Sequence, residues 1–487
     1  MNSDNRLGEV AKIIANLSQD RNQQGARHHG QVTLDPHSPQ LRGINMEHKH
    51  ESDNNGAMTH HGPSATQAPE ESCRHRSMTD LAQRPLDGAA FYWLVAAMFS
   101  VTLGYGVLLP VLPFLLERLL NDPNEAAIAY HTGWLMGTFM FALFVCAPLW
   151  GFVSDRIGRR AVIMVGLGGH ILSLALFALV QSLWIAYLAR ALSGMFLSAV
   201  LPVAQAYVSE TSSEKTLGRR LAWTSAASLS GSVVGPALSG GIYAVGRALE
   251  WGGFAGANMS ALPLFAAALF GLPVLLGIIT KLPVSAPFVK PEESKGQVPH
   301  GRQGWQLFAL LTLSLIVMFG HGGFEVGITL QGRQVFGHDP YQIGLMFAMC
   351  AVVMILVQTA VYVRPGFLSR FRGTYIVVPS LTAMALGFLF LPGAHDGLLM
   401  SLLVALIAGG VGMWSAASNT FLARGTRKNL GIALGLQTAA ASVGQGLGSV
   451  TGGSLYAVLT GSSFLVMAGL MLTGALLGFL WNRFGIR

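Results

Sequence analysis

The chain has 487 residues, of which 52% are hydrophobic and only 11% are charged, and its mean hydropathy is +0.49. This composition excludes an ordinary soluble domain and indicates an integral membrane protein. The formal net charge of +8 does not indicate a nucleic-acid partner, because the Lys and Arg residues fall in short links between apolar segments.

Residues 1–88 are polar and poor in large apolar side chains, which predicts a disordered, His-rich cytoplasmic tail. Most of the chain's 14 histidines lie in it, but their spacing is irregular, so we predict neither a metal site nor a cofactor. The methionines at 46, 58 and 78 leave a later start of translation open. We expect no cleavable signal peptide, and the first apolar segment should direct insertion.

From Ala89 onward, twelve apolar segments each approach or exceed the roughly 20 residues that span a bilayer as a helix. They cover residues 90–116, 127–150, 161–182, 184–206, 221–246, 259–280, 305–329, 341–363, 374–393, 398–421, 432–458 and 463–482. Alternate links collect nearly all the Lys and Arg residues and leave only Arg118, Arg247 and Arg333 on the other side. This bias predicts a multi-pass protein of the inner (cytoplasmic) membrane with both termini in the cytoplasm.

A polar, proline-rich stretch at 282–304 divides the segments into two sets of six. We therefore expect an N-terminal half at 89–281, a cytoplasmic linker at 282–304 and a C-terminal half at 305–487. An internal repeat supports this division, because residues 231–245 align with residues 444–458 at an offset of 213 residues. The prediction is an all-α membrane protein with twelve transmembrane helices in two pseudo-symmetric halves around a central cavity.

The link between the second and third segments concentrates glycine and charge within residues 151–160. It predicts a tight loop at the membrane surface, in which an acid can meet an arginine or a helix end. The residues that carry this pattern are Gly151, Asp155, Arg156, Gly158, Arg159 and Arg160.

These six residues reproduce the pattern G-x-x-x-D-R-x-G-R-[RK], and the chain therefore resembles the major facilitator superfamily of transporters. The resemblance implies a cytoplasmic gate, in which Asp155 closes a charge contact when the carrier is open to the outside. The corresponding link in the second half, at 364–373, keeps glycine and arginine but lacks the acid.

The fifth segment carries Gly231, Gly235, Pro236 and Gly240, a spacing that permits close helix packing with a bend at the proline. It is similar to the superfamily's antiporter motif G-x-x-x-G-P-x-x-G-G, with Ser239 in place of the first terminal glycine. This resemblance favours export over uptake.

The first segment carries Gly104, Gly106, Pro110 and Pro113, and the two prolines should loosen its outer part. It resembles the first-helix motif of twelve-helix drug/proton antiporters, which include tetracycline and multidrug efflux pumps. Those pumps carry an acid where this chain has Val101, a departure that leaves the substrate and the proton site open.

Arg190 is a single arginine inside the fourth apolar segment, where a guanidinium requires a partner or a wet cavity unless it snorkels to the outer surface. Its surroundings resemble the family's fourth-helix motif, which implies a role in proton coupling. Glu325 is the only acid within an apolar segment, and His321 lies one helical turn before it. Such a carboxylate either exchanges protons beside a cavity, with Arg190 as its partner, or rests at the outer interface.

Six further side chains are expected to line a cavity of mixed polarity, namely Gln205, Trp223, Gln358, Trp414, Asn419 and Gln437. The predicted function is export of a small organic molecule, a drug or a metabolite, in exchange for protons by a monomer in the lipid bilayer. A dedicated siderophore exporter, a proton-linked nutrient importer and a metal-responsive sensor remain alternatives. Neither a nucleotide-binding P-loop nor paired catalytic carboxylates occur, so we predict no enzyme activity.

Overall fold

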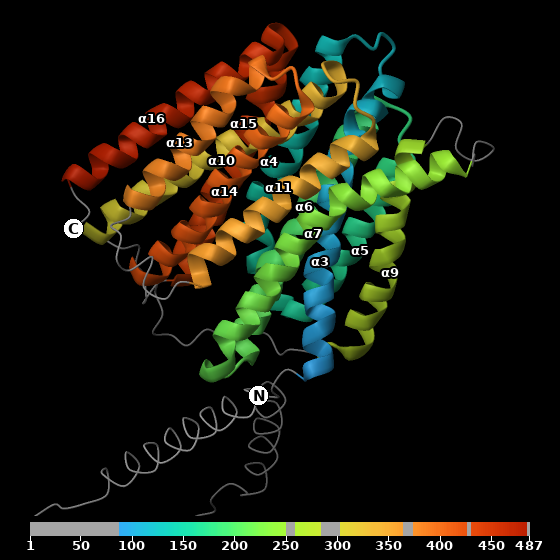
Figure 1. Ribbon diagram of the computed structural model, residues 1–487. Helices are drawn as coiled ribbons and strands as arrows, with labels where there is room; N and C mark the ends of the chain where they lie inside the picture. The colour runs from blue at the N-terminus through green and yellow to red at the C-terminus, as the bar shows by residue number, and fades with distance from the viewer. Residues whose placement is uncertain (1–86, 250–258, 284–301, 364–373, 426–429, 485–487) are drawn as a thin grey trace, which may run out of the picture. The chain divides into compact units, whose positions relative to one another are not determined.

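The computed structural model describes residues 87–249, 259–283, 302–363, 374–425 and 430–484 (Figure 1). These residues form twelve long α-helices. The first six are α3 (Gly88–Leu119), α4 (Glu125–Ile157), α5 (Arg159–Ala178), α6 (Leu183–Thr211), α7 (Glu214–Ala248) and α9 (Leu262–Lys281). The second six are α10 (Arg302–Gln334), α11 (Pro340–Val363), α13 (Thr374–Phe390), α14 (Gly397–Gly425), α15 (Leu430–Leu459) and α16 (Ser463–Phe484).

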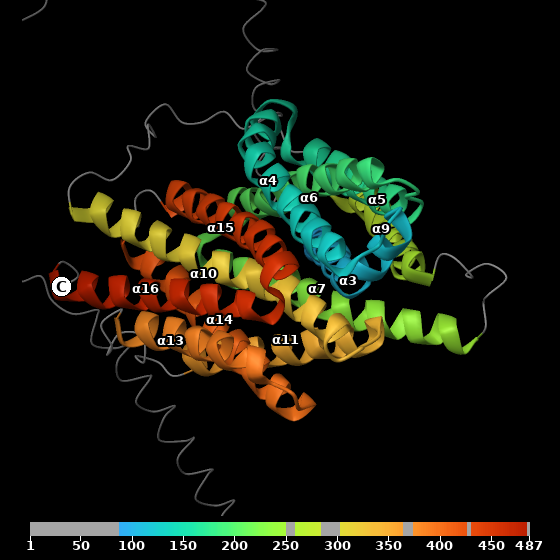
Figure 2. The same ribbon diagram turned by 90° about the horizontal axis from the view of Figure 1, so that it is seen from above.

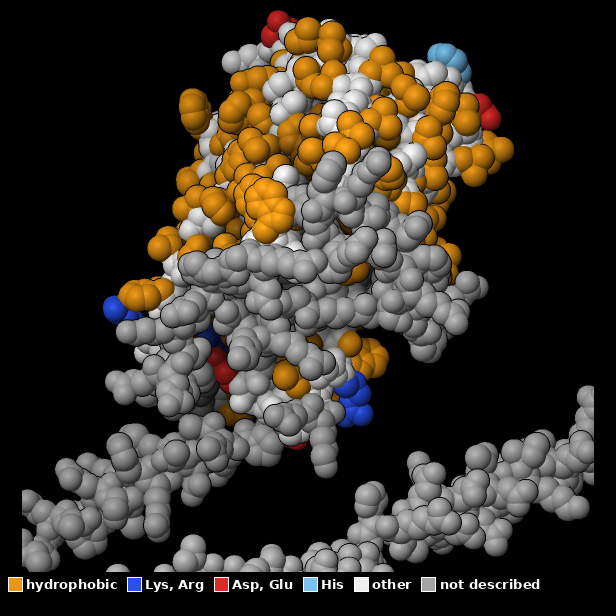
Figure 3. Space-filling model, turned by 90° about the vertical axis from the view of Figure 1, so that its left-hand side faces the viewer, with side chains coloured by type: hydrophobic (Ala, Val, Ile, Leu, Met, Phe, Trp, Pro, Cys, Tyr) orange, Lys and Arg blue, Asp and Glu red, His pale blue; other side chains and the backbone are white. Residues whose placement is uncertain are grey.

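Each helix covers one of the twelve predicted apolar segments, because a chain in lipid must satisfy its backbone hydrogen bonds internally. Ten stretches are long and apolar enough to cross a membrane, and one of them, Gly435–Leu480, takes in most of α15 and α16. The helix α7 is not among the ten, because its small and polar residues lower its hydropathy. Apolar side chains cover much of the described surface in Figure 3. The His-rich tail, the link at 364–373 and most of the linker lie outside the described residues.

The prediction of a loop at 151–160 is wrong. The helix α4 continues through Ile157 and α5 begins at Arg159, so that Gly158 alone separates them. Gly158 has a φ of +94°, a conformation that glycine adopts without steric cost. Charged residues did not end α4, because a helix that passes beyond the hydrocarbon layer can place them in water. The helix α3 likewise stays α-helical through Pro110 and Pro113.

The same glycine contact occurs in both halves. Gly231 and Gly235 of α7 pack on α3, while Gly444 and Gly448 of α15 pack on α10. A Cβ at any of the four would collide with the backbone of the neighbouring helix, and one at Gly235 would lie 2.7 Å from the carbonyl oxygen of Leu103. The repeat in the sequence thus corresponds to one helix pair used twice, α3 with α7 and α10 with α15.

Another pair of glycines related by the repeat, Gly240 and Gly453, joins the two halves. Gly240 of α7 lies against the start of α11, where a Cβ would be 2.8 Å from the Cα of Tyr341. Gly453 of α15 lies against α4, where a Cβ would be 2.6 Å from the carbonyl oxygen of Ala129. Figure 2 shows α11 beside α7 and α15 beside α4, which are the two most extensive contacts between the halves.

An ion-pair cluster joins the halves at the same end of the bundle. Arg333, near the end of α10, contacts Glu117 of α3 and Glu125 of α4, each at 3.0 Å. We call this the Arg333 end and the opposite end, which carries Gly158, the Asp155 end. The contacts of Gly240, Gly453 and Arg333 therefore bring the halves together at the Arg333 end.

Candidate functional site

A buried carboxylate lies where the two halves meet. Glu325 on α10 is 5% exposed, and its Oε2 accepts hydrogen bonds from the Tyr105 hydroxyl of α3 at 2.7 Å and from Gln445 Nε2 of α15 at 2.8 Å. His321 Nε2, one turn earlier on α10, is 3.5 Å from Glu325 Oε1. The bond from Tyr105 links the carboxylate of one half to a side chain of the other half.

Arg190 lies close to this carboxylate but does not pair with it directly. It is 2% exposed, which excludes the snorkelling interpretation, and its Nε donates to the carbonyl oxygen of Leu135 at 3.3 Å. Its guanidinium carbon lies 4.3 Å from the ring centre of Phe139 and 5.9 Å from that of Tyr105. Tyr105 stacks on Phe139, which Arg190 also contacts, and it donates a hydrogen bond to Glu325. Tyr105 therefore connects Arg190 to Glu325, the two residues predicted to be partners.

Sequence reasoning missed Tyr105 and Gln445. Tyr105 lies between Gly104 and Gly106 of the first-helix motif, and Gln445 lies between glycines of the repeat in α15. Each is a polar side chain among residues that we interpreted as packing residues. Their position inside glycine motifs is the signal that could have identified them, because close helix approach brings such side chains to the opposite helix.

The two glycine motifs of the first half pack on each other. A Cβ on Gly106 of α3 would lie 2.8 Å from the Cδ of Pro236 on α7. Gly104, on another side of α3, faces His170 of α5, with the ring Nε2 2.6 Å from where a Cβ would be. These glycines allow α3 to approach α5 and α7 closely. This close packing fixes α3, and with it the position of Tyr105, which lies between the two glycines in the sequence.

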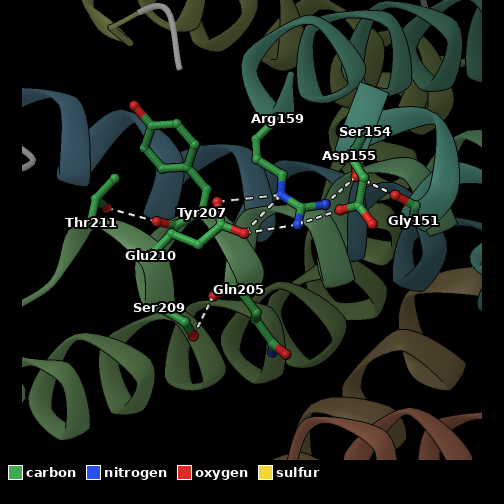
Figure 4. Close-up of polar contacts among 9 residues, drawn as sticks. All are labelled: Gly151, Ser154, Asp155, Arg159, Gln205, Tyr207, Ser209, Glu210 and Thr211. Atoms are coloured by element: carbon green, nitrogen blue, oxygen red, sulfur yellow. Dashed lines mark hydrogen bonds and ion pairs between the residues drawn. The ribbon is translucent and has the colours of Figure 1, made fainter. Parts of the chain in front are cut away.

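Three residues of the predicted gate, Gly151, Asp155 and Arg159, belong to a second network at the Asp155 end (Figure 4). Arg159, at the start of α5, pairs with Asp155 of α4 at 2.6 Å and with Glu210 of α6 at 2.8 Å. The Ser154 hydroxyl donates to the Gly151 carbonyl and accepts a hydrogen bond from Arg159. This network ties the α4–α5 turn to α6 within the first half, and Glu210 was not predicted from the sequence.

The other two gate arginines contact groups of the same half. The guanidinium carbon of Arg156 lies 4.0 Å from the ring centre of Phe152, and Arg160 donates to the carbonyl oxygen of Ile279 in α9. In this conformation the described contacts of the motif brace the first half internally.

A cavity of about 110 Å³ lies between α10, α14 and α15. Trp414 and Gln437 line it, together with Ser314 and Met318. Gln205, Trp223 and Gln358 are not among its lining residues. Asn419 lies in α14, outside the side chains that the structure describes. Among the described residues, no group of three or more His, Cys, Asp or Glu side chains is placed to hold a metal ion.

Long apolar helices in two related sets of six, joined through a buried titratable cluster, define a membrane transport protein. Residues 94–431 match the model of the Major Facilitator Superfamily, and the chain belongs to this family. It is therefore a multi-pass membrane transporter, and members of this family are not enzymes.

The relatives of this chain include proteins named for drug resistance. The chain is 25% identical to multidrug resistance protein 1 of Bacillus subtilis, over 80% of this chain and 95% of that protein. It is 28% identical to the class C tetracycline resistance protein of Escherichia coli, over 66% of this chain and 78% of that protein. It is 23% identical to the quinolone resistance protein NorA of Staphylococcus aureus, over 78% of this chain and 93% of that protein.

Solved structures share the fold. The human organic anion transporter MFSD10 matches with a TM-score of 0.58 and 22% identity, over 81% of this chain and 100% of that chain. A bacterial homologue of the human lysosomal transporter Spinster, in an inward-facing and occupied conformation, matches with a TM-score of 0.63 and 15% identity. The match covers 82% of this chain and 98% of that chain.

Proposed function

We propose that this transporter exports a small organic molecule in exchange for protons, with Glu325 as the proton-binding group. The observation that carries the proposal is the bond from Tyr105 to the buried Glu325 carboxylate, which crosses between the halves. The similarity to proteins named for multidrug, tetracycline and quinolone resistance supports export of a drug-like molecule.

The bond explains how proton binding and conformational change would be coupled. A hydrogen bond to an ionised carboxylate is about twice as strong as a neutral one. The ionised Glu325 therefore holds the halves together beneath the contacts of the Arg333 end, and protonation weakens this link. An empty, ionised carrier is then slow to change conformation, which prevents a futile leak, while binding of either a proton or cargo permits the change.

The distribution of basic residues supports a cytoplasmic location for the Asp155 end, since nearly all Lys and Arg residues of the links fall on that side. The Arg333 end, where the halves are in contact, then faces outward. A carrier whose halves are in contact at the outer end accepts its cargo from the cytoplasm, as alternating access requires of an exporter.

Everted membrane vesicles that contain the full chain test the proposal. We expect them to accumulate ethidium or tetracycline when the lumen is acidified, to lose the gradient as cargo enters, and to stop when a protonophore is added. Accumulation in right-side-out vesicles at low external pH would instead establish a nutrient importer. If both fail, comparison of metabolites in the medium and inside cells with and without the protein tests the siderophore alternative.

Replacing Arg190 by methionine is expected to lower proton-driven transport about 10-fold or more, within the usual range of coupling free energies. The substitution removes the cation beside Tyr105, while the long, uncharged side chain of methionine still fills the buried site. Arg190→Lys should retain part of the activity, because a lysine keeps the charge but not the planar contact with Phe139. The measurement is the rate of uptake into vesicles at matched expression. Equal rates for Arg190→Met and wild type would contradict a role of Arg190 in proton coupling.

Replacing Asp155 by asparagine is expected to slow transport about 10-fold while the protein still folds. The carboxylate of Asp155 is partly exposed, and such ion pairs contribute roughly 0–1 kcal/mol to stability. Glu210→Gln should reproduce the loss, because both acids hold Arg159. Initial rates and thermal unfolding should be compared with Asp122→Asn in the turn before α4. Normal rates in both Asp155→Asn and Glu210→Gln would exclude a gating role.

A further inference from the structure

The cavity between α10, α14 and α15 presents hydrogen-bond acceptors. Gln437 Oε1 is buried and has no hydrogen-bond partner among the residues that the structure describes. The hydroxyls of Ser415 and Ser418, which also line the cavity, donate to backbone carbonyls of α14 at 2.9 Å and 3.2 Å. Because their protons are used within the helix, these oxygens offer only lone pairs to a ligand.

A second unpaired group lies in the same wall. Ser314 on α10 is 1% exposed, and its hydroxyl has no hydrogen-bond partner within the described part of the chain. Buried polar atoms are nearly always paired, since an unpaired one loses its bonds to water without compensation. Two such atoms, on α10 and α15, lining one cavity indicate a site that a bound molecule completes.

The remaining wall is apolar and aromatic. Trp414, which is 1% exposed, lines the cavity with Met318 and Ala441. The volume of about 110 Å³ exceeds the roughly 30 Å³ that one water occupies in the liquid, and it admits a single ring. An indole beside a narrow space favours a flat aromatic group, because the rings can stack or meet edge to face.

The lining carries no charged side chain among its described residues. Glu325 lies seven residues beyond Met318 on α10, about 10 Å along the helix. A charged ligand group in the cavity would thus lack a partner and lose its hydration, which is costly. The site therefore suits an uncharged group.

We infer that this cavity is a substrate subsite for an uncharged aromatic ring that carries O–H or N–H donors, such as a phenol or a catechol. The inference rests on the proposed transport of small organic molecules and specifies the chemical class of cargo. The ring lies against Trp414, its donors reach Gln437 and the serine oxygens, and Ser314 completes its pairing with a ring substituent.

The same two helices connect this subsite to the carboxylate. The helix α10 carries Ser314 and Glu325, and α15 carries Gln437 and, two turns later, the Glu325 partner Gln445. A ligand that draws Gln437 and Ser314 together acts on the helix pair that holds Glu325, so binding of cargo and of a proton bias the same packing interface.

The test uses catechol and 1,2-dimethoxybenzene, which share a ring but differ in donors, titrated by calorimetry into the purified full-length protein at a fixed pH. We expect catechol to bind about 10-fold more tightly than the ether, the effect of one unmet hydrogen bond. Gln437→Leu should abolish this preference and Ser314→Ala should reduce it. Gln181→Leu, the same change at an exposed side chain in the turn between α5 and α6, should leave it intact.

Equal binding of both probes, binding of neither, or a preference that survives Gln437→Leu and Ser314→Ala would overturn the inference. Because these titrations need no pH gradient, they are independent of the vesicle assay. A catechol preference together with absent proton-driven transport would uphold the subsite and reject the proposed coupling. Proton-driven transport without a catechol preference would uphold the proposed coupling and reject the subsite.

Discussion

Vesicles that contain Glu325→Gln are expected to lose about 10–100-fold of the transport driven by a pH gradient, the usual range for a coupling free energy of 1–3 kcal/mol. Glutamine keeps the shape of the side chain and an oxygen that can accept the Tyr105 bond at 2.7 Å, but it cannot bind or release a proton. Exchange of unlabelled for labelled cargo at equal concentrations requires no proton movement. We therefore expect exchange to persist in this variant.

Retained cargo exchange in Glu325→Gln is the critical control. It shows that the variant is folded and binds cargo, so that the loss of transport reflects lost coupling to protons. Asp396→Asn, an exposed carboxylate in the turn before α14, is the matched substitution and should transport as wild type. Cargo-induced proton release, measured with a pH-sensitive dye on the purified protein, should likewise disappear in Glu325→Gln alone. If this variant still concentrates cargo against its gradient, the proton-binding group lies elsewhere.

Gly240→Val is expected to abolish transport, whereas Gly241→Val, its neighbour, should have little effect. A Cβ at Gly240 would meet the Cα of Tyr341 at 2.8 Å and the carbonyl oxygen of Pro340 at 2.9 Å, both backbone atoms that cannot move aside alone. A Cβ at Gly241 would meet nothing within 4 Å. Since both changes place the same residue in the same helix, differences in helix propensity cancel.

The mechanism predicted for Gly240→Val is separation of the halves at the Arg333 end. Spin labels at positions 122 and 396, which lie in turns of different halves at that end, should report a longer distance in this variant than in wild type or Gly241→Val. The three native cysteines must be replaced first. An unchanged distance with full activity would show that the contact of α7 with α11 is not required to close this end.

The extents of the helices could be predicted from hydropathy because a backbone in lipid has few alternatives to the helix. The repeat of Gly231 and Gly235 at Gly444 and Gly448 likewise predicted related halves, since a glycine spacing on a helix records where another helix approaches. The end of α4 could not be predicted in this way. Charge and glycine at 151–157 are typical of a loop, yet a helix that leaves the membrane carries the same residues into water.

The sequence by itself determined that this protein is a helical membrane transporter and that Arg190, Glu325 and Asp155 are charged groups in unusual positions, because a charge among apolar residues is visible without a structure. Only the tertiary structure decided which groups they meet. Tyr105 bonds to Glu325 across 220 residues and Glu210 pairs with Arg159 across 51. Such contacts depend on how helices pack, and packing is a property of pairs of surfaces that no single segment contains.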